Sequence, residues 1–402
     1  MRDGMVARSA RWAAVAGTEL IPLNVAEMDF PTDPVVVERI QRLLLGPLTY
    51  SPPYTDNDIA GAVVDHYRRE HGLAVPRRNV QLAAGIVAQS YHVMRELLAP
   101  SDAGLYFGPA YHSIPDSITA AGARAVAVHL DPWTTPAWDV AELERRIVPG
   151  TRLIHLSHPH NPTGHQFGLD ELRAIADVAE RHDLLIVSNE VYARLTLQGR
   201  HLPMAAIAPR RTLTITGATK SHNLAGIGGS VMFSHDSELM ARLRSGTRFS
   251  LAAGRSIQQA ALAAAYEQDS PWLRATRDRL RANQHRIAAE LRRCRAVDVH
   301  VPVATYFLWL RVGELPEQAD AAQVLRDGCG LVGAPGAEFG ASRDFVRLAV
   351  AMTPEDVDMV VARIRAWSRY EVSVDRAAPV LPARLGARRE PFPARCTGKD
   401  VT

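Results

Sequence analysis

One lysine stands in a loop of small residues, at a position suited to covalent chemistry. The loop runs from Gly217 to Gly226 and contains Lys220, and it follows the β-branched run 212–216, which predicts a buried strand. A lone lysine beside glycine is usually a surface residue in a turn. Two other loops change this interpretation, because they place further polar side chains at the same edge of a predicted sheet.

Both of these loops follow apolar runs. Asn161 begins an Asn-Pro-Thr-Gly segment after the run 153–157, and Asn189 and Tyr192 follow the run 184–187. Open α/β sheets bind their ligands outside the carboxyl ends of their strands. We therefore expect these side chains and the lysine to meet in one ligand site.

The elements that must position these residues alternate along the chain from residue 80. Parallel strands need long crossover connections, so strands joined mostly by amphipathic helices predict a largely parallel sheet that is covered on both faces. The predicted strands are 80–83, 103–107, 125–129, 153–157, 184–188, 212–216 and 230–234, and the helices between them include 87–98, 140–148, 169–182 and 236–245.

The flanking segments predict a second, smaller α+β unit. We expect residues 1–45, an arm and a helix capped by Asp33, to join this unit, and residues 46–270 to form the large domain. Long helices, the strands 297–301, 305–311 and 345–350, and a last helix ending at Trp367 predict a small domain over 271–367. Residues 368–402, rich in Pro and Arg, are expected to be a flexible tail.

Composition argues against several classes of protein. The 402 residues are 22% charged and 47% hydrophobic, which is ordinary for a globular protein, and they include neither a long apolar run nor a signal core, so a cytoplasmic protein is expected. The segment from Ser368 onward accounts for the whole net charge of +3, which leaves no basic footprint for nucleic acid. The cysteines, Cys294, Cys329 and Cys396, are widely spaced and show no metal-ligand pattern.

Taken in order, these motifs resemble the fold-type I enzymes of the class I/II aminotransferase superfamily, which use pyridoxal 5'-phosphate (PLP). The resemblance covers roughly residues 20–367. Asn189 lies 28 positions after Asn161, and Tyr192 three after Asn189, as in this superfamily. The resemblance implies an α/β fold with a large domain built on a seven-stranded, mostly parallel sheet and a smaller α+β domain.

It also implies roles for individual residues. Lys220 resembles the lysine that forms an imine with the cofactor aldehyde and later moves the substrate Cα proton. Asn161 and Tyr192 resemble the residues that bind the phenolic oxygen of the cofactor, and Tyr111 the aromatic residue that stacks on its ring. Arg347 resembles the arginine whose planar fork holds the substrate carboxylate.

Several weaker sequence signals predict which residues bind the phosphate of the cofactor. Gly85, Ile86 and Val87 lie between a strand and a helix, where free amides and the helix dipole suit an anion. Thr219 would add a hydroxyl donor. Tyr50 resembles a tyrosine that reaches the phosphate of a neighbouring subunit, which implies a homodimer with shared active sites.

Finer motifs resemble the cystathionine β-lyase-like carbon-sulfur lyases, which cleave cysteine S-conjugates by α,β-elimination. These motifs are Ser-Ala-Arg-Trp at 9–12, Val-Ala-Glu-Met-Asp-Phe at 25–30, and the segments 158–164 and 220–226. The resemblance places Ala26 and His222 near the substrate, although a packed histidine at 222 is as plausible. A more distant similarity is to actinobacterial enzymes that process S-cysteinyl conjugates in lincosamide-type antibiotic assembly.

The chain departs from this pattern at several positions, which leave the reaction open. Asn189 stands where the family has an Asp that keeps the pyridine nitrogen protonated; its amide could instead donate to an unprotonated nitrogen, giving a weaker electron sink. Gly217 and Gly228 replace phosphate-binding Ser and Arg, and Asn24 replaces a Trp of the lyase branch. Decarboxylation or oxidative deamination, transamination (suggested by Tyr192 in place of the lyase His), and a catalytically weak binding module remain alternatives.

Overall fold

The large domain is built on one seven-stranded sheet. The computed structural model describes residues 9–48, 58–83, 85–247 and 255–374. The strand order is β2-β8-β7-β6-β5-β3-β4, and within this sheet β8 alone runs antiparallel to its neighbours, so the prediction of a mostly parallel sheet is confirmed. The strands are β2 (Gln81–Ala83), β3 (Ala103–Gly108), β4 (Arg124–His129), β5 (Thr151–Ser157), β6 (Leu185–Asn189), β7 (Thr212–Thr216) and β8 (Ser230–Phe233).

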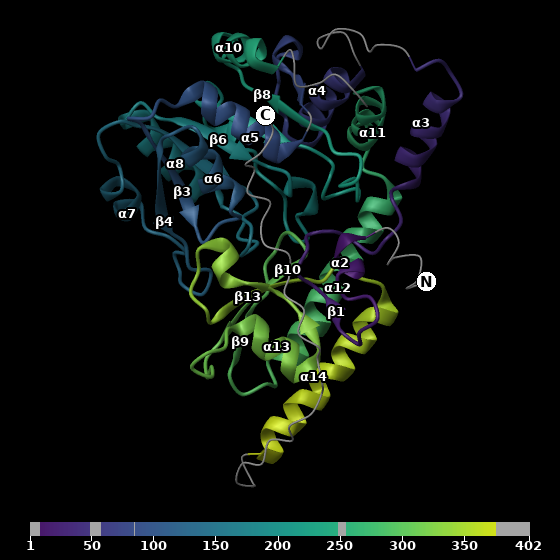
Figure 1. Cartoon of the computed structure of the whole chain (residues 1–402). Coiled ribbons are helices and arrows are strands. Elements are labelled where there is room, and N and C mark those ends of the chain that lie inside the picture. Colours follow the sequence, from purple (N-terminus) through teal and green to yellow (C-terminus); the bar gives the residue numbers. More distant parts are fainter. Residues whose placement is uncertain (1–8, 49–57, 84, 248–254, 375–402) are drawn as a thin grey trace, which may run out of the picture.

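Helices cover both faces of this sheet (Figure 1). Successive side chains of a strand point to opposite faces, and Leu153 and Ile154 of β5 accordingly belong to different hydrophobic cores. Ile154 packs with Leu172 of α8, whereas Leu153 packs with Val93 of α5. The helices of this domain are α4 (Asp58–His71), α5 (Ile86–Leu97), α6 (Ser113–Ala120), α7 (Val140–Arg145), α8 (Leu169–Arg181), α9 (Met204–Ile207), α10 (Ser237–Thr247) and α11 (Arg255–Glu267), with 3-10 turns η1 (Arg77–Asn79) and η2 (Ala193–Leu195).

The smaller unit contains an antiparallel sheet of order β12-β13-β10-β9. Ser270 caps the helix that leads into it, because its hydroxyl accepts a hydrogen bond from the amide of Leu273 at 3.0 Å. The elements are α12 (Pro271–Leu291), β9 (Val297–His300), β10 (Phe307–Val312), α13 (Ala321–Cys329), β11 (Leu331–Val332), β12 (Ala334–Pro335), η3 (Gly336–Phe339), β13 (Phe345–Ala349) and α14 (Pro354–Val374). No helix in the described ranges is long and apolar enough to cross a membrane.

The N-terminal segment divides between the two units. The arm contains a short helix, α2 (Ala10–Ala13), and a strand, β1 (Ile21–Pro22), which pairs with β11 of the small domain. Helix α3 (Pro34–Leu44) instead lies beside α11 of the large domain (Figure 1), where Val36 packs with Ile59. The boundary expected at 45 stays a prediction, because this segment contacts both units: β1 pairs with the small one, and α3 packs on the large one.

The last helix is longer than the sequence predicts. Helix α14 continues past Trp367 to Val374, so the expected tail begins with helical residues. Tyr50, Cys396 and the rest of the tail from 375 lie outside the described residues.

Candidate active site

Lys220 lies in the loop that follows β7, against the N-terminal arm. Its Nζ donates a hydrogen bond to the carbonyl oxygen of Ala26 at 2.7 Å. Removal from water, followed by the positive charge of Arg347, lowers the pKa of Lys220 to about 8. A substantial fraction of this amine is therefore neutral near physiological pH, as a nucleophile or a proton acceptor requires.

Arg347 lies on β13 and reaches into the large domain. Its Nη1 donates to Oδ1 of Asn161 at 2.9 Å, and its Nη2 donates to the carbonyl oxygen of Asn24 at 2.6 Å. The guanidinium carbon lies 4.4 Å from the ring centre of Phe307 and 4.9 Å from that of Phe339. The side chain is buried, and its Nε has no hydrogen-bond partner within the described part of the protein. A buried donor of this kind suits an incoming carboxylate.

Asn161 joins two of the expected cofactor loops. Its Oδ1 accepts from Arg347, so its side-chain NH₂ is left to donate elsewhere. Its backbone carbonyl accepts from the amide of Tyr111 at 3.1 Å, which ties the loop after β3 to the loop after β5. The structure thus brings Asn161, Tyr111 and Arg347 together.

Asn189 ends strand β6, and the orientation of its amide is set by the backbone. Its Oδ1 accepts a hydrogen bond from the amide of Val191 at 3.3 Å. Because an N–H group must face the oxygen, the Nδ2 donor points away from this contact. Asn189 therefore presents a donor, whereas an ionised Asp would present only acceptors.

Glu190, the next residue, is hydrogen-bonded within this turn. Glu190 is buried, and it accepts hydrogen bonds from the Ser188 hydroxyl at 2.9 Å and the Met204 amide at 3.1 Å, while His201 lies 3.0 Å away. Burial raises the pKa of Glu190. Tyr192 is also buried, and burial raises the pKa of its phenol. Neither Glu190 nor its partners carry a sequence pattern that would have identified them.

The expected phosphate site consists mainly of backbone amides and glycines, with Thr219 nearby. Helix α5 begins at Ile86 after Gly85, and no side chain of the described residues caps its first amides, which leaves them available to an anion. A Cβ at Gly217 would lie 3.2 Å from the carbonyl oxygen of Gly229, so a serine there would need a shift of the neighbouring backbone. Gly228 has φ +73°, which favours glycine over the arginine of related chains. Thr219 is half-buried in the same loop.

The arm is tied to the lysine loop by side-chain hydrogen bonds. Asn223 donates through Nδ2 to the carbonyl oxygens of Met28 at 3.0 Å and Phe30 at 2.7 Å. The carboxylate of Asp29 accepts from Nε1 of Trp12 at 2.9 Å and pairs with Arg11 at 2.5 Å. The motifs at residues 9–12 and 25–30 thus form one buried network. The sequence indicated these motifs only by their resemblance to a family and did not predict that they touch.

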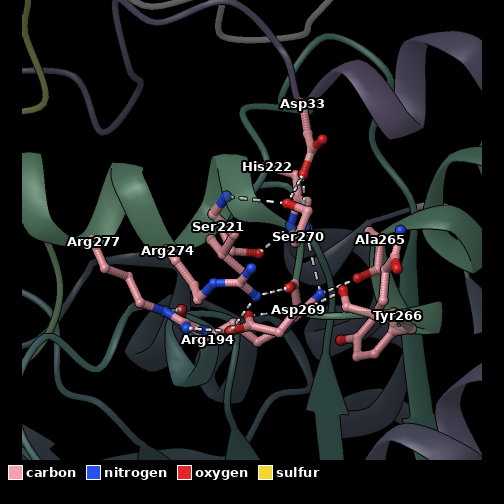
Figure 2. Close-up of polar contacts among 12 residues, drawn as sticks. Asp33, Arg194, Ser221, His222, Ala265, Tyr266, Asp269, Ser270, Arg274 and Arg277 are labelled. Atoms are coloured by element: carbon pink, nitrogen blue, oxygen red, sulfur yellow. Dashed lines mark hydrogen bonds and ion pairs between the residues drawn. The ribbon is translucent and has the colours of Figure 1, made fainter.

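His222 packs within a second polar cluster. It is fully buried; Nη1 of Arg194 donates to its Nε2 at 3.4 Å, and its Nδ1 lies 2.8 Å from the Ser221 hydroxyl (Figure 2). Burial, then the charge of Arg194, lower the pKa of His222 well below its ordinary value. These contacts favour packing over a role at the substrate.

Arg194 is the centre of this second cluster, and sequence reasoning missed it. It donates to the carbonyl oxygens of Ala265 and, at 3.2 Å, Gln268, and it lies 3.7 Å from Asp269 (Figure 2). Because η2 carries Arg194 just after Tyr192, the cluster joins the Tyr192 turn to the Lys220 loop. Two of its partners are backbone carbonyls, and its side-chain partners come from distant segments, so no local sequence pattern identifies it.

The residues gathered here fit PLP. The half-buried amine of Lys220, the donor face of Asn189 and the free amides at the start of α5 suit an aldehyde, a ring nitrogen and a phosphate respectively. The unpartnered Nε of Arg347 leaves capacity for a carboxylate beside them. Tyr50, expected at the phosphate, lies outside the described residues.

Comparisons with known proteins identify the family of the chain. The sequence model described as aminotransferase class I and II matches residues 18–364. The chain is 31% identical to the probable N-succinyldiaminopimelate aminotransferase of Mycobacterium tuberculosis, over 74% of this chain and 77% of that protein. It is 26% identical to the cystathionine beta-lyase of Corynebacterium glutamicum, over 89% of this chain and 96% of that protein.

Two further matches show the range of the similarity. The chain is 31% identical to the aspartate/prephenate aminotransferase of Thermus thermophilus, but the match spans only 55% of that protein and 52% of this chain. The structure of cystalysin from Treponema denticola, which contains PLP, superposes with a TM-score of 0.82 at 20% identity, over 91% of this chain and 96% of that one, and so shares the fold. The chain belongs to the aminotransferase class I and II family and is a PLP-dependent enzyme of fold type I.

Proposed function

We propose that this enzyme is a carbon-sulfur lyase that performs α,β-elimination on a cysteine S-conjugate. The observation that carries the proposal is the contact between Lys220 and the arm: a segment of the lyase type, residues 25–30, supplies the carbonyl of Ala26 that binds Nζ. Asn223 holds the rest of that segment in place. The similarity to a cystathionine beta-lyase along most of both chains supports the same assignment.

The residues of the site have distinct proposed roles. Arg347 binds the substrate α-carboxylate through its fork, and Lys220, neutral in part at pH 7 to 8, removes the proton from Cα. PLP, when bound, withdraws electrons from Cα and so makes that proton acidic. The Cα–H electron pair then forms the Cα–Cβ double bond as the Cβ–S bond breaks, and the sulfur leaves as a thiolate. Water converts the resulting 2-aminoacrylate to pyruvate and ammonium.

Asn189 supports elimination over transamination. Its Oδ1 is held by Val191, so its Nδ2 would donate to an unprotonated ring nitrogen. Such a ring withdraws electrons less strongly than a pyridinium, and negative charge at Cα would be short-lived. When a thiolate leaves, it carries the negative charge away from Cα at once. In transamination this negative charge must instead persist until another carbon is protonated.

Two alternatives carry specific support. The 31% identity to an aminotransferase over most of that protein, together with Tyr192, favours transamination as a second candidate. The altered ring environment at Asn189 also suits loss of the carboxylate or an oxidative deamination of an S-cysteinyl conjugate.

The departures at Asn24, Gly217 and Gly228 suggest a specialised, antibiotic-type pathway, and the resemblance of Tyr50 suggests a homodimer.

The products distinguish these reactions. The purified enzyme with PLP is incubated with L-cystathionine and with S-benzyl-L-cysteine, and thiol, pyruvate, carbon dioxide and amino-group transfer are measured. Equal amounts of thiol and pyruvate, lost in Lys220→Ala, are expected. Carbon dioxide with the carbon-sulfur bond intact would replace the proposal by decarboxylation, and transfer of the amino group to a keto acid without thiol release would replace it by transamination.

A further inference from the structure

The hydroxyl of Tyr306 is a buried polar group that the site described above does not use. Tyr306 is fully buried just before β10, and its Oη has no hydrogen-bond partner within the described part of the protein. An unpaired buried hydroxyl costs free energy, so a phenylalanine would pack at this position at lower cost. Packing alone therefore does not explain the hydroxyl.

The backbone that carries this side chain has a strained conformation. Thr305 has φ +69°, in the left-handed region that β-branched residues rarely adopt. Its amide donates to the Leu195 carbonyl at 2.9 Å, and its hydroxyl accepts from the Phe307 amide at 3.2 Å. Gln284 donates to the carbonyl oxygens of Phe307 at 3.0 Å and Thr305 at 3.4 Å. Strain that several contacts enforce in this way is common at functional sites.

The same contacts fix Tyr306 against the turn that begins at Tyr192. The Leu195 carbonyl belongs to η2, and the Leu195 amide donates to the Tyr192 carbonyl at 2.8 Å. The ring centres of Tyr192 and Tyr306 lie 5.9 Å apart, and the ring planes are inclined at 77°. A strained segment of the small domain thus places one phenol beside the phenol that is expected to bind the cofactor.

The two phenols act on each other electrostatically. Burial raises the pKa of Tyr192, whereas the charge of Arg347 and then the hydroxyl of Tyr306 lower it. Burial, followed by Tyr192, raises the pKa of Tyr306. These opposite effects are those of a pair in which Tyr306 donates and Tyr192 accepts. Tyr111 and Arg11 are the other titratable or charged groups that act on the pair.

We propose that Tyr306 is a positioning residue, whose hydroxyl donates to the phenol oxygen of Tyr192 and so directs the Tyr192 hydrogen toward the phenolic oxygen of the cofactor. A phenol can accept one hydrogen bond while it donates another, so Tyr192 can serve both partners. The proposal rests on the proposed role of Tyr192 at the cofactor, and it holds whichever reaction the site performs.

This arrangement has a measurable effect on the bound cofactor. Hydrogen bonds in a chain polarise one another, so a Tyr192 hydroxyl that accepts from Tyr306 donates more strongly. Tyr192 and the nitrogen that joins PLP to Lys220 compete as donors to the phenolic oxygen. Stronger donation by Tyr192 lowers the pKa of that nitrogen, and loss of the Tyr306 hydroxyl should raise it.

The visible absorbance of the holoenzyme, titrated with pH, follows the proton on this nitrogen. Tyr306→Phe keeps the ring and removes only the hydroxyl, and its midpoint should lie about half a pH unit or more above that of the wild type. Tyr106→Phe removes a hydroxyl from a ring on β3 in another hydrophobic core, and it should leave the midpoint unchanged. A wild-type midpoint in Tyr306→Phe would overturn the proposal.

Two further measurements separate this role from a structural one. The midpoint of the double variant Tyr192→Phe/Tyr306→Phe should equal that of Tyr192→Phe, because Tyr306 acts through Tyr192; a further rise would contradict the proposal. Since the hydroxyl has no partner in the described chain, the full chain without PLP should unfold at the same temperature or higher in Tyr306→Phe. A lower unfolding temperature would assign the hydroxyl a packing role instead.

Tyr192→Phe alone distinguishes the two proposed roles. A midpoint unchanged in Tyr192→Phe would refute the role of Tyr192 at the cofactor, and the role of Tyr306 with it. A raised midpoint in Tyr192→Phe with a wild-type midpoint in Tyr306→Phe would refute the role of Tyr306 alone.

Discussion

Nη1 of Arg347 lies 2.9 Å from Oδ1 of Asn161, although the arginine belongs to the small-domain sheet and the asparagine to a loop of the large domain. The residue proposed to bind the substrate carboxylate thus also orients the amide of a residue proposed to bind the cofactor. Any relative movement of the domains changes both at once.

The charge of Arg347 is expected to control the lysine. Arg347→Gln keeps a hydrogen-bond donor for Asn161 but removes the cation that helps to lower the pKa of Lys220, so this pKa should rise above its value of about 8. Only the neutral amine reacts with an aldehyde. The rate at which apoenzyme recombines with PLP should therefore increase with pH to a plateau above about pH 8 in the wild type. In Arg347→Gln the inflection of this rate-against-pH curve should lie at higher pH. Arg343→Gln, on the exposed surface of the same domain, is the control; an inflection shared by all three proteins would contradict this account.

Asn189→Asp is expected to speed the removal of the Cα proton. One carboxylate oxygen can still accept from the Val191 amide, and the other can stabilise a protonated ring nitrogen. Exchange of the substrate Cα proton with deuterated solvent should increase about tenfold, which corresponds to about 1.4 kcal/mol in the barrier. Proton NMR measures the exchange, with Asn189→Ala as the matched variant that lacks both groups. Unchanged or slower exchange in Asn189→Asp would show that the ring nitrogen does not limit this step.

Arg194→Met is expected to destabilise the enzyme and loosen the cofactor. The substitution keeps most of the side-chain volume but leaves the buried carbonyl of Ala265, and the more exposed carbonyl of Gln268, without this donor. The free energy of unfolding should fall by roughly 2–4 kcal/mol, since unpaired buried polar groups are costly. Urea unfolding and the rate of PLP loss on dilution measure the two effects. Arg200→Met, an exposed side chain bound to one carbonyl, is the control, and equal stability of the two variants would argue against the role given to Arg194.

Asn223→Asp is expected to release the arm from the lysine loop. Asn223 has φ +56°, which Asp tolerates, so the substitution isolates the side-chain contacts from backbone strain. The carboxylate would face the carbonyl oxygens of Met28 and Phe30, where the amide now donates. Hydrogen exchange of residues 24–30, followed by mass spectrometry, should become faster, and turnover in the proposed lyase reaction should fall. If exchange stayed at the wild-type rate, these two hydrogen bonds would not be what holds the arm.

The sequence by itself determined the large sheet and most of the cofactor loops. The β-branched and apolar runs that form β5, β6 and β7 span only a few residues each, and the side chains that follow them lie at strand ends by the geometry of a parallel sheet. The positions of these runs are therefore enough to place Lys220, Asn161 and Asn189 at one edge of the sheet. Arg347 and the branch motifs were assigned by resemblance alone.

Only the tertiary structure decided how these segments touch. Lys220, Arg347 and Asn189 are oriented by the carbonyl of Ala26, the carbonyl of Asn24 and the amide of Val191, which are backbone groups that almost any residue type could provide. His222 shows the same limit, because its burial beside Arg194 depends on how α11 and the Tyr192 turn pack around it. Local side-chain periodicity encodes strands and helices, whereas contacts between distant segments arise from the packing of the whole chain and leave no local pattern in the sequence.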